Sequence, residues 1–145
     1  MKRHLSMFAL VFVLAACATN PAQRDAERLV LYRTHAAAPV PSFHYFGSLN
    51  GWTPLGDSAL VVWTRPNQAY LLELSGRCID LDYASAISVS NQFGRVYARF
   101  DKVSVIGRNT NTFPCHIRQI QPLDVKAVRQ AERDKRSAGQ SSAGA

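Results

Sequence analysis

The sequence predicts a mainly β fold: a small antiparallel barrel or sandwich of about five to seven strands, with short N- and C-terminal helices. Three observations predict it. Short apolar runs rich in β-branched and aromatic residues recur between residues 42 and 124. The turns between them are shorter than the roughly dozen residues that a parallel crossover needs. Polar segments with capping residues and helical spacing lie on either side.

The first 16 residues have the pattern of a bacterial lipoprotein signal peptide. The basic start Met1–His4 precedes the apolar run Leu5–Val13, which is roughly half the 20 residues that span a bilayer. Leu14-Ala15-Ala16-Cys17 then matches the lipobox, in which small residues precede a cysteine whose thiolate takes a diacylglyceryl group. We therefore expect cleavage before Cys17, which becomes the lipid-bearing first residue of the mature protein.

An ordinary secretory signal, cut after Ala18, is the alternative. The basic start, the short apolar run and the lipobox agree in register, which favours the lipoprotein. In Gram-negative lipoproteins, an aspartate directly after the cysteine commonly retains the protein in the inner membrane. Ala18 stands there instead. By analogy we expect an outer-membrane protein that faces the periplasm and contacts the membrane through the lipid on Cys17.

Residues 17–41 are expected to form a lipid-anchored helix and a linker. Asn20 suits the N-cap, Pro21 the first helical turn and Gln23 the capping-box position. Apolar residues at helical spacing continue to about Thr34, before a proline-containing segment breaks the helix. This helix either packs on the domain or lies along the membrane.

Residues 42–124 are expected to form the β domain. Asn50-Gly51 predicts a tight turn, and Arg65–Gln68 joins two apolar runs into a hairpin. Gly107–Pro114 is a polar loop. The candidate strands are Phe43–Phe46, Ala59–Thr64, Ala69–Leu74, Arg77–Leu81, Ala86–Val89, Val96–Asp101, Val103–Ile106 and Cys115–Ile120.

The C-terminal segment is polar and charged. Asp124 can cap a helix across Val125–Arg136. Ser137–Ala145 is rich in serine, glycine and alanine, and we expect it to be disordered.

The chain has a formal net charge of +7. Its basic residues are scattered among acids instead of forming a patch, and together with the expected export this argues against a nucleic-acid partner. A basic balance is compatible with an anionic envelope surface.

Two cysteines, Cys78 and Cys115, remain after the lipidated one. An oxidising compartment favours a disulfide between them. The alternatives are a metal site that also uses His116 and a reactive thiol with that histidine as its base. The spacing matches no common zinc pattern and no CxxC occurs, so we predict the disulfide.

No GxSxG, HExxH, Walker, GxGxxG or EF-hand motif occurs, and nothing in the sequence implies a cofactor. His35, His44 and His116 are isolated, so none is expected to be a catalytic base. Asp80-x-Asp82 could place two carboxylates on one strand face, although turn-forming acids are the favoured explanation. Trp52, beside the predicted turn, is the best exposed candidate for a ligand contact.

The stretch from Pro39 to Asp124 resembles an uncharacterised family of short Gram-negative lipoproteins, a domain of unknown function. The resemblance implies an envelope lipoprotein with two paired cysteines, and it implies no activity. The matching residues are Pro41-Ser42-Phe43, Gly51-Trp52-x-x-Leu55-Gly56-Asp57, Val62-Trp63-Thr64, Tyr70-Leu71-Leu72-x-Leu74, Cys78, Asp101-x-Val103, Cys115-x-Ile117 and Ile120-x-Pro122-x-Asp124.

These observations predict a periplasm-facing binding or accessory module that acts on an envelope protein or glycan and is not an enzyme. Two alternatives remain: a small envelope enzyme with a carboxylate or histidine site, and an inhibitor of a lytic enzyme. A pocket with two converging ionisable groups would favour the enzyme, whereas a protruding rigid loop would favour the inhibitor.

Overall fold

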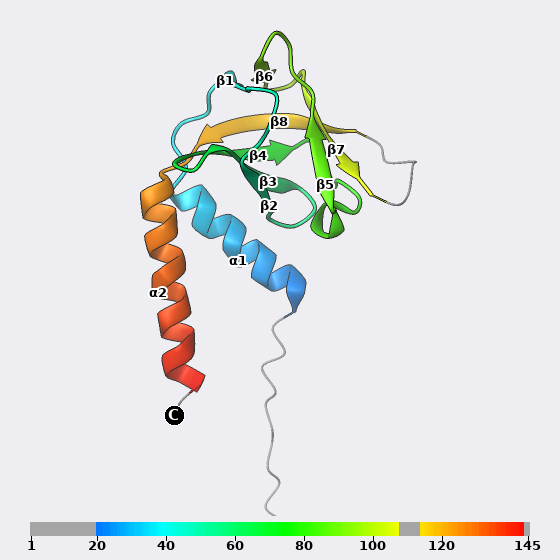
Figure 1. The fold of residues 1–145 in the computed structure, drawn as a ribbon. Helices are drawn as coiled ribbons and strands as arrows, with labels where there is room; N and C mark the ends of the chain where they lie inside the picture. Colours follow the sequence, from blue (N-terminus) through cyan, green and yellow to red (C-terminus); the bar gives the residue numbers. More distant parts are fainter. Residues whose placement is uncertain (1–19, 108–113, 144–145) are drawn as a thin grey trace, which may run out of the picture.

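The computed structural model describes residues 20–107 and 114–143, and Figure 1 shows their arrangement. The expected signal peptide and Cys17 lie outside the described residues. The fold is mainly β with a helix at each end, as predicted. The elements are α1 (Pro21–Thr34), β1 (Ser42–His44), β2 (Gly51–Pro54), β3 (Ala59–Arg65), β4 (Gln68–Leu74), the 3-10 helix η1 (Leu81–Tyr83), β5 (Ala86–Val89), β6 (Arg95–Tyr97), β7 (Lys102–Ile106), β8 (Cys115–Pro122) and α2 (Val125–Ala143).

The described strands form two antiparallel sheets. Six of them pair in the order β2-β3-β4-β8-β7-β5 and curve into a half-barrel. The other two, β1 and β6, pair with each other as a separate ribbon. The fold is thus an open form of the predicted barrel, with the ribbon as a second small layer.

The hairpin of β3 and β4 lies at the centre of the large sheet and is buried on both faces. Leu60 and Leu72 belong to the apolar cluster on one face, whereas Val61 and Leu71 belong to the cluster on the other. Successive strand residues point to opposite faces, so a strand covered on both sides is apolar at consecutive positions. The run Ala-Leu-Val-Val at 59–62 follows from this burial.

Different elements cover the two faces of the sheet (Figure 1). The helices α1 and α2 lie on one face, where Tyr32 and Val128 join the buried cluster. The β1–β6 ribbon lies on the other, where Phe43 and Val96 are buried and the Phe43 ring stacks on Tyr70 at 4.5 Å between centroids. The domain therefore has two small cores separated by one sheet.

Helix α1 has the predicted bounds and packs on the domain. Asn20 Oδ1 accepts a hydrogen bond from the amide of Ala22 at 3.1 Å, and Pro21 occupies the first position, where no amide hydrogen is needed. The hydroxyl of Tyr32 donates to Glu132 of α2 at 2.8 Å. Among the residues that the structure describes, no helix is long and apolar enough to cross a membrane.

Cys78 and Cys115 form the predicted disulfide, with their Cα atoms 5.6 Å apart. Cys78 is buried in the loop after β4, and Cys115 is the first residue of β8. The bond excludes the alternative metal and thiol roles, because both thiols are consumed. It holds the loop after β4 against the sheet.

The prediction of a tight turn at Asn50-Gly51 is wrong. Gly51 is the first residue of β2 and pairs with Trp63, and the amide of Asn50 donates to the Trp63 carbonyl at 2.7 Å. Pairing with β3 overrides the local turn preference of the dipeptide. This unpredicted strand brings the described strands to eight.

Two predicted strands differ in the structure. Arg77–Leu81 is a loop that leads into the 3-10 helix, because Cys78 and Leu81 both turn into the core. Val96–Asp101 is strand only as far as Tyr97, whose amide donates to the Asp101 carboxylate at 2.7 Å.

The C-terminal segment is helical where disorder was predicted. Helix α2 continues to Ala143. The hydroxyls of Ser137 and Ser141 each donate to a carbonyl one turn earlier, at 3.1 Å. These bonds remain within the helix, so the serines do not end it.

Candidate partner-binding surface

A two-residue turn precedes β6. The amide of Gln92 donates to the carbonyl of Arg95 at 2.7 Å, and the amide of Arg95 donates back at 3.0 Å. The central residues, Phe93 and Gly94, have φ of +50° and +76°. Positive φ at both central positions is the pattern of a type I′ turn, and Asn91 Oδ1 accepts the Gly94 amide at 3.3 Å. The turn is thus held by three hydrogen bonds.

Phe93 is an unusual residue for this position. A type I′ turn favours asparagine, aspartate or glycine, because other side chains in the left-handed region cost roughly 1 kcal/mol or more. The Phe93 side chain is also fully exposed, so burial does not offset that cost. Neither the local backbone conformation nor packing therefore explains a phenylalanine at this position.

Phe46 lies two residues after the end of β1, next to this turn. The amide of Tyr45 donates to the Gly94 carbonyl at 2.8 Å, which places the end of β1 against the turn. The Phe46 ring is 63% exposed, stacks on His44 at 6.2 Å and has the Arg65 guanidinium 5.0 Å from its centre.

Arg95 organises the polar part of this surface. Its Nη2 lies 2.8 Å from Nε2 of His44, and its Nη1 donates to the hydroxyl of Ser42 at 3.0 Å. Arginine has only donors, so Nε2 of His44 is the acceptor of this hydrogen bond. The guanidinium thereby fixes the imidazole that stacks on Phe46.

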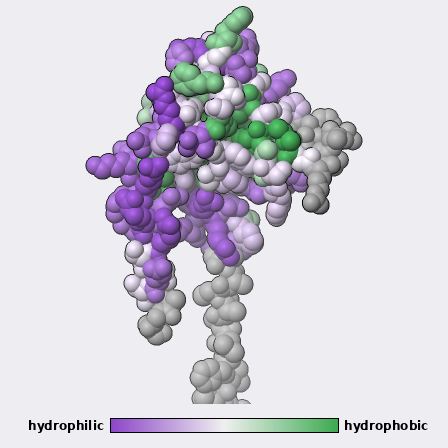
Figure 2. Space-filling view, in the orientation of Figure 1, coloured by the Kyte–Doolittle hydropathy of each residue, from purple (hydrophilic) through white to green (hydrophobic). Residues whose placement is uncertain are grey.

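We define the Phe93 surface as His44, Phe46, Arg65, Phe93 and Arg95. The segments that contribute to it, 42–46, 65 and 91–97, contain no aspartate or glutamate. Figure 2 shows exposed hydrophobic residues at the end of the molecule that carries β1 and β6. The surface therefore combines exposed aromatic rings with guanidinium groups.

The sequence-predicted ligand contact, Trp52, lies elsewhere. It is half-buried in β2, opposite Val62, and packs against one apolar cluster. The structure thus gives Trp52 a packing role on the sheet edge instead of a place among the exposed aromatics.

The isolated histidines and paired acids remain apart from the Phe93 surface, with the exception of His44. His35 is the C-cap of α1, and His116 is exposed in β8 opposite Lys102. Asp80 lies in a turn with φ of +62° and precedes the 3-10 helix that contains Asp82. The two carboxylates therefore do not share a strand face, and the favoured expectation of turn-forming acids is confirmed.

A groove of about 780 Å³ lies beside the amino end of α1 and is lined by Asp25, Asp57 and Asp82. Burial raises the pKa of the Asp82 carboxyl, and the charges of Asp25 and Asp57 act in the same direction, against a hydrogen bond from the Gly56 backbone. Asp57 pairs with Arg77 at 2.5 Å. Within residues 20–107 and 114–143, no group of three or more His, Cys, Asp or Glu side chains could hold a metal ion.

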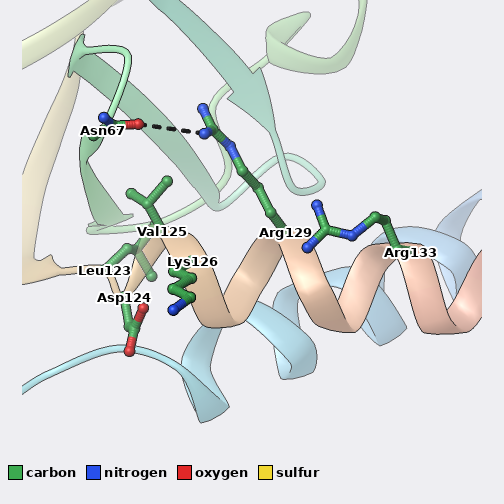
Figure 3. A pocket seen from close by; sticks show the side chains of 7 residues that line it. All are labelled: Asn67, Leu123, Asp124, Val125, Lys126, Arg129 and Arg133. Atoms are coloured by element: carbon green, nitrogen blue, oxygen red, sulfur yellow. Dashed lines mark hydrogen bonds between the residues drawn. The ribbon is translucent and has the colours of Figure 1, made fainter.

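Figure 3 shows a second groove, of about 630 Å³, between α2 and the β3–β4 turn. Arg129 extends from the helix toward Asn67, with its Nη1 3.4 Å from Oδ1, and donates to the Pro66 carbonyl at 2.6 Å. These contacts tie α2 to the hairpin, so Arg129 serves the fold. Lys126 and Arg133 make the lining basic.

Sequence reasoning did not identify Phe46 or Phe93. The indication in the sequence for Phe93 was an aromatic residue directly before a glycine and directly after the polar segment Ser90–Gln92. Such a dipeptide is as compatible with a buried aromatic as with an exposed one. The structure shows the exposure, with the dipeptide at the centre of the turn before β6.

Comparisons with known proteins leave the activity open. No curated protein and no solved structure matches the chain. One family model, described as a family of unknown function (DUF6491), matches residues 1–139. Since the match covers nearly the whole chain, the protein belongs to this family of unknown function.

Proposed function

We propose that the protein is a lipid-anchored binding module of the bacterial cell envelope, which recognises a partner protein through the Phe93 surface. The observation that carries the proposal is the fully exposed phenylalanine in a left-handed backbone conformation. A large aromatic side chain on a rigid turn contributes strongly to binding when it fills a pocket.

The shape of the surface supports a protein partner over a glycan. The ring of Phe46 is already contacted by His44 and Arg65, so Phe93 is the ring that a partner can surround. A projecting side chain suits an apolar pocket, whereas a ligand such as a sugar is usually held in a concave site. The cleft of a lytic enzyme is one pocket of this kind, so the inhibitor alternative is a special case of this proposal.

The charges of the Phe93 surface predict the charges around the partner's pocket. Arg65 and Arg95 flank the aromatic rings, and the contributing segments carry no acid. Carboxylates around the partner's pocket would be complementary to these guanidinium groups and would speed association.

The envelope location rests on the lipobox that ends at Cys17. Helix α1 begins four residues after this cysteine, and Figure 1 shows its amino end and the β1–β6 ribbon on opposite sides of the large sheet. A lipid on Cys17 would therefore leave the Phe93 surface directed away from the membrane.

Photocrosslinking in cells tests the proposal. The crosslinker p-benzoylphenylalanine replaces Phe93 in one variant and Tyr83, an exposed aromatic residue beside the amino end of α1, in the control. We expect a discrete protein adduct from position 93 and not from position 83. The purified partner should bind Phe93→Ala about tenfold or more weakly than the unmodified chain. Equal adducts at both positions, or unchanged affinity, would overturn the proposal.

A carboxylate enzyme is the second candidate, favoured by the groove that contains Asp82. A carboxyl group with a raised pKa keeps its proton to higher pH and can act as a general acid. If this candidate is correct, Asp82→Asn abolishes the cellular phenotype in a folded protein while Phe93→Ala preserves it. The binding-module proposal predicts the reverse.

A further inference from the structure

The loop between β4 and β5 presents two apolar side chains to solvent. Ile79 is 72% exposed and Tyr83 is 88% exposed. Cys78, just before Ile79, and Leu81, between the two, are fully buried. The disulfide from Cys78 to Cys115 fixes the loop to the sheet. Ile79 and Tyr83 are thus held outward on a rigid support.

This loop lies beside the amino end of α1. The groove of about 780 Å³ is lined by Arg77 and Tyr83 from the loop and by Asn20 and Pro21 from the start of the helix. Cys17 precedes Asn20 by three residues, which can span at most about 11 Å. The loop and any lipid on Cys17 must therefore be close neighbours.

We propose that residues 77–83 form a second membrane contact, in which Ile79 and Tyr83 enter the headgroup region of the leaflet that holds the acyl chains of Cys17. The inference rests on the proposed lipid anchor. Tyrosine suits this depth because its ring is apolar and its hydroxyl remains among polar headgroups. The surface that covers Ile79 and Tyr83 in this proposal is thus a lipid bilayer.

Two attachment points would orient the domain. A lipid anchor alone allows the domain to rotate about the segment before α1. Once the anchor is inserted, the loop meets the membrane at high effective concentration, so even a weak contact is populated. This orientation holds the β1–β6 end, with the Phe93 surface, away from the membrane (Figure 1).

The charges around the loop predict which lipids it prefers. The grooves on either side of Tyr83 are lined by four carboxylates, those of Asp25, Asp57, Asp80 and Asp82, and by the cations Arg28 and Arg77. The excess of negative charge would be repelled by anionic headgroups. We therefore expect the loop to favour zwitterionic lipids.

Lipid crosslinking tests the inference on the mature, acylated protein in phosphatidylcholine–phosphatidylethanolamine vesicles. Intact-mass measurement first establishes the acyl increment on Cys17. The crosslinker p-benzoylphenylalanine is then placed at position 83 or, as the matched control, at position 93. We expect lipid adducts at 83 and none at 93, and several-fold fewer adducts when phosphatidylglycerol replaces half of the lipid.

A second pair of variants keeps the test specific. Ile79→Ser should lower the lipid adducts at position 83 several-fold, whereas Val30→Ser, which changes another exposed aliphatic residue on α1, should leave them unchanged. Equal adducts at 83 and 93, no adduct at 83, or an adduct to a second copy of the chain would overturn the membrane contact while the anchor stands. A chain without acyl groups would overturn the anchor and the contact together.

Discussion

The carboxylate of Glu73, on the central strand β4, accepts a hydrogen bond from Nε of Arg33 in α1 at 2.7 Å. Its other oxygen accepts from Arg118 of β8 at 2.5 Å. Glu73 is buried, whereas both arginines are partly exposed. One carboxylate thus joins the N-terminal helix to two adjacent strands of the sheet.

Replacing this carboxylate should destabilise the domain. Glu73→Gln removes the charge that both guanidinium groups bind, and we expect a loss of about 1–3 kcal/mol in the free energy of unfolding by urea. Glu27→Gln, which breaks the exposed pair with Lys135, is the matched control and should cost much less. Equal losses for the two variants would contradict the structural role of Glu73.

Glu73 should also make the stability of the domain depend on pH in the acid range. Burial raises the pKa of Glu73, but the hydrogen bonds and charges of Arg33 and Arg118 outweigh it and hold the pKa below its usual value. Its contribution to stability is therefore present above the unfolded-state pKa of about 4.3 and lost as the pH falls through the lower folded-state pKa. Urea unfolding at decreasing pH should show the wild-type protein and Glu73→Gln converging. A gap that stays constant would refute the linkage.

Tyr32 should make the stability of the domain depend on pH in the alkaline range. Burial, followed by the hydrogen bond to Glu132, raises the pKa of Tyr32 to about 12. The stability linked to the protonated hydroxyl is complete below the unfolded-state pKa of about 10 and is lost as the pH rises through the folded-state value. As the pH rises through this range, the free energy of unfolding by urea should fall more in the wild-type protein than in Tyr32→Phe, which cannot ionise at this position.

Phe93→Asn should stabilise the fold while it weakens partner binding. Asparagine before glycine is favoured in a type I′ turn, and the exposed phenylalanine ring contributes no burial that would be lost. We expect a gain of roughly 1 kcal/mol in the free energy of unfolding. Phe46→Asn, at the second phenylalanine of the Phe93 surface, lacks this conformational gain and serves as the control. A destabilised Phe93→Asn variant would mean that the phenylalanine serves the fold.

The disulfide should supply a large share of the domain's stability. Replacing Cys78 and Cys115 by serine opens a link between positions 37 residues apart, which corresponds to roughly 4 kcal/mol on the chain-entropy model. Urea unfolding of the double variant measures the loss. Alkylation of the native, unreduced protein should find neither thiol, and two reactive thiols in periplasmic material would show that the bond is not structural.

Lipid attachment at Cys17 is a separate prediction from the lipobox. Intact-mass measurement of the mature chain should give a first residue Cys17 with a diacyl or triacyl increment. Cys17→Ser should abolish both the increment and membrane association. An unmodified chain that begins at Thr19 would instead support the ordinary secretory signal.

The sequence by itself predicted the features that depend on near neighbours or on simple periodicity. Asn20 and Pro21 begin α1 because capping needs only the first turn of the helix. The β3–β4 hairpin follows from two apolar runs around a short polar turn. The Cys78–Cys115 bond was expected from counting the cysteines and from the oxidising compartment that the lipobox predicts.

Only the tertiary structure decided the features that depend on distant segments. Gly51 is in a strand because β3 offers it a partner, although the local dipeptide favours a turn. Glu73 and Arg33 meet although 40 residues separate them, and nothing near Glu73 in the sequence marks its burial. Phe93 is exposed at the centre of the turn before β6, and the segment after β1, distant in the sequence, is hydrogen-bonded to this turn through Tyr45 and Gly94. Local propensity cannot specify such positions, because they are set by which strands pair and which faces are covered.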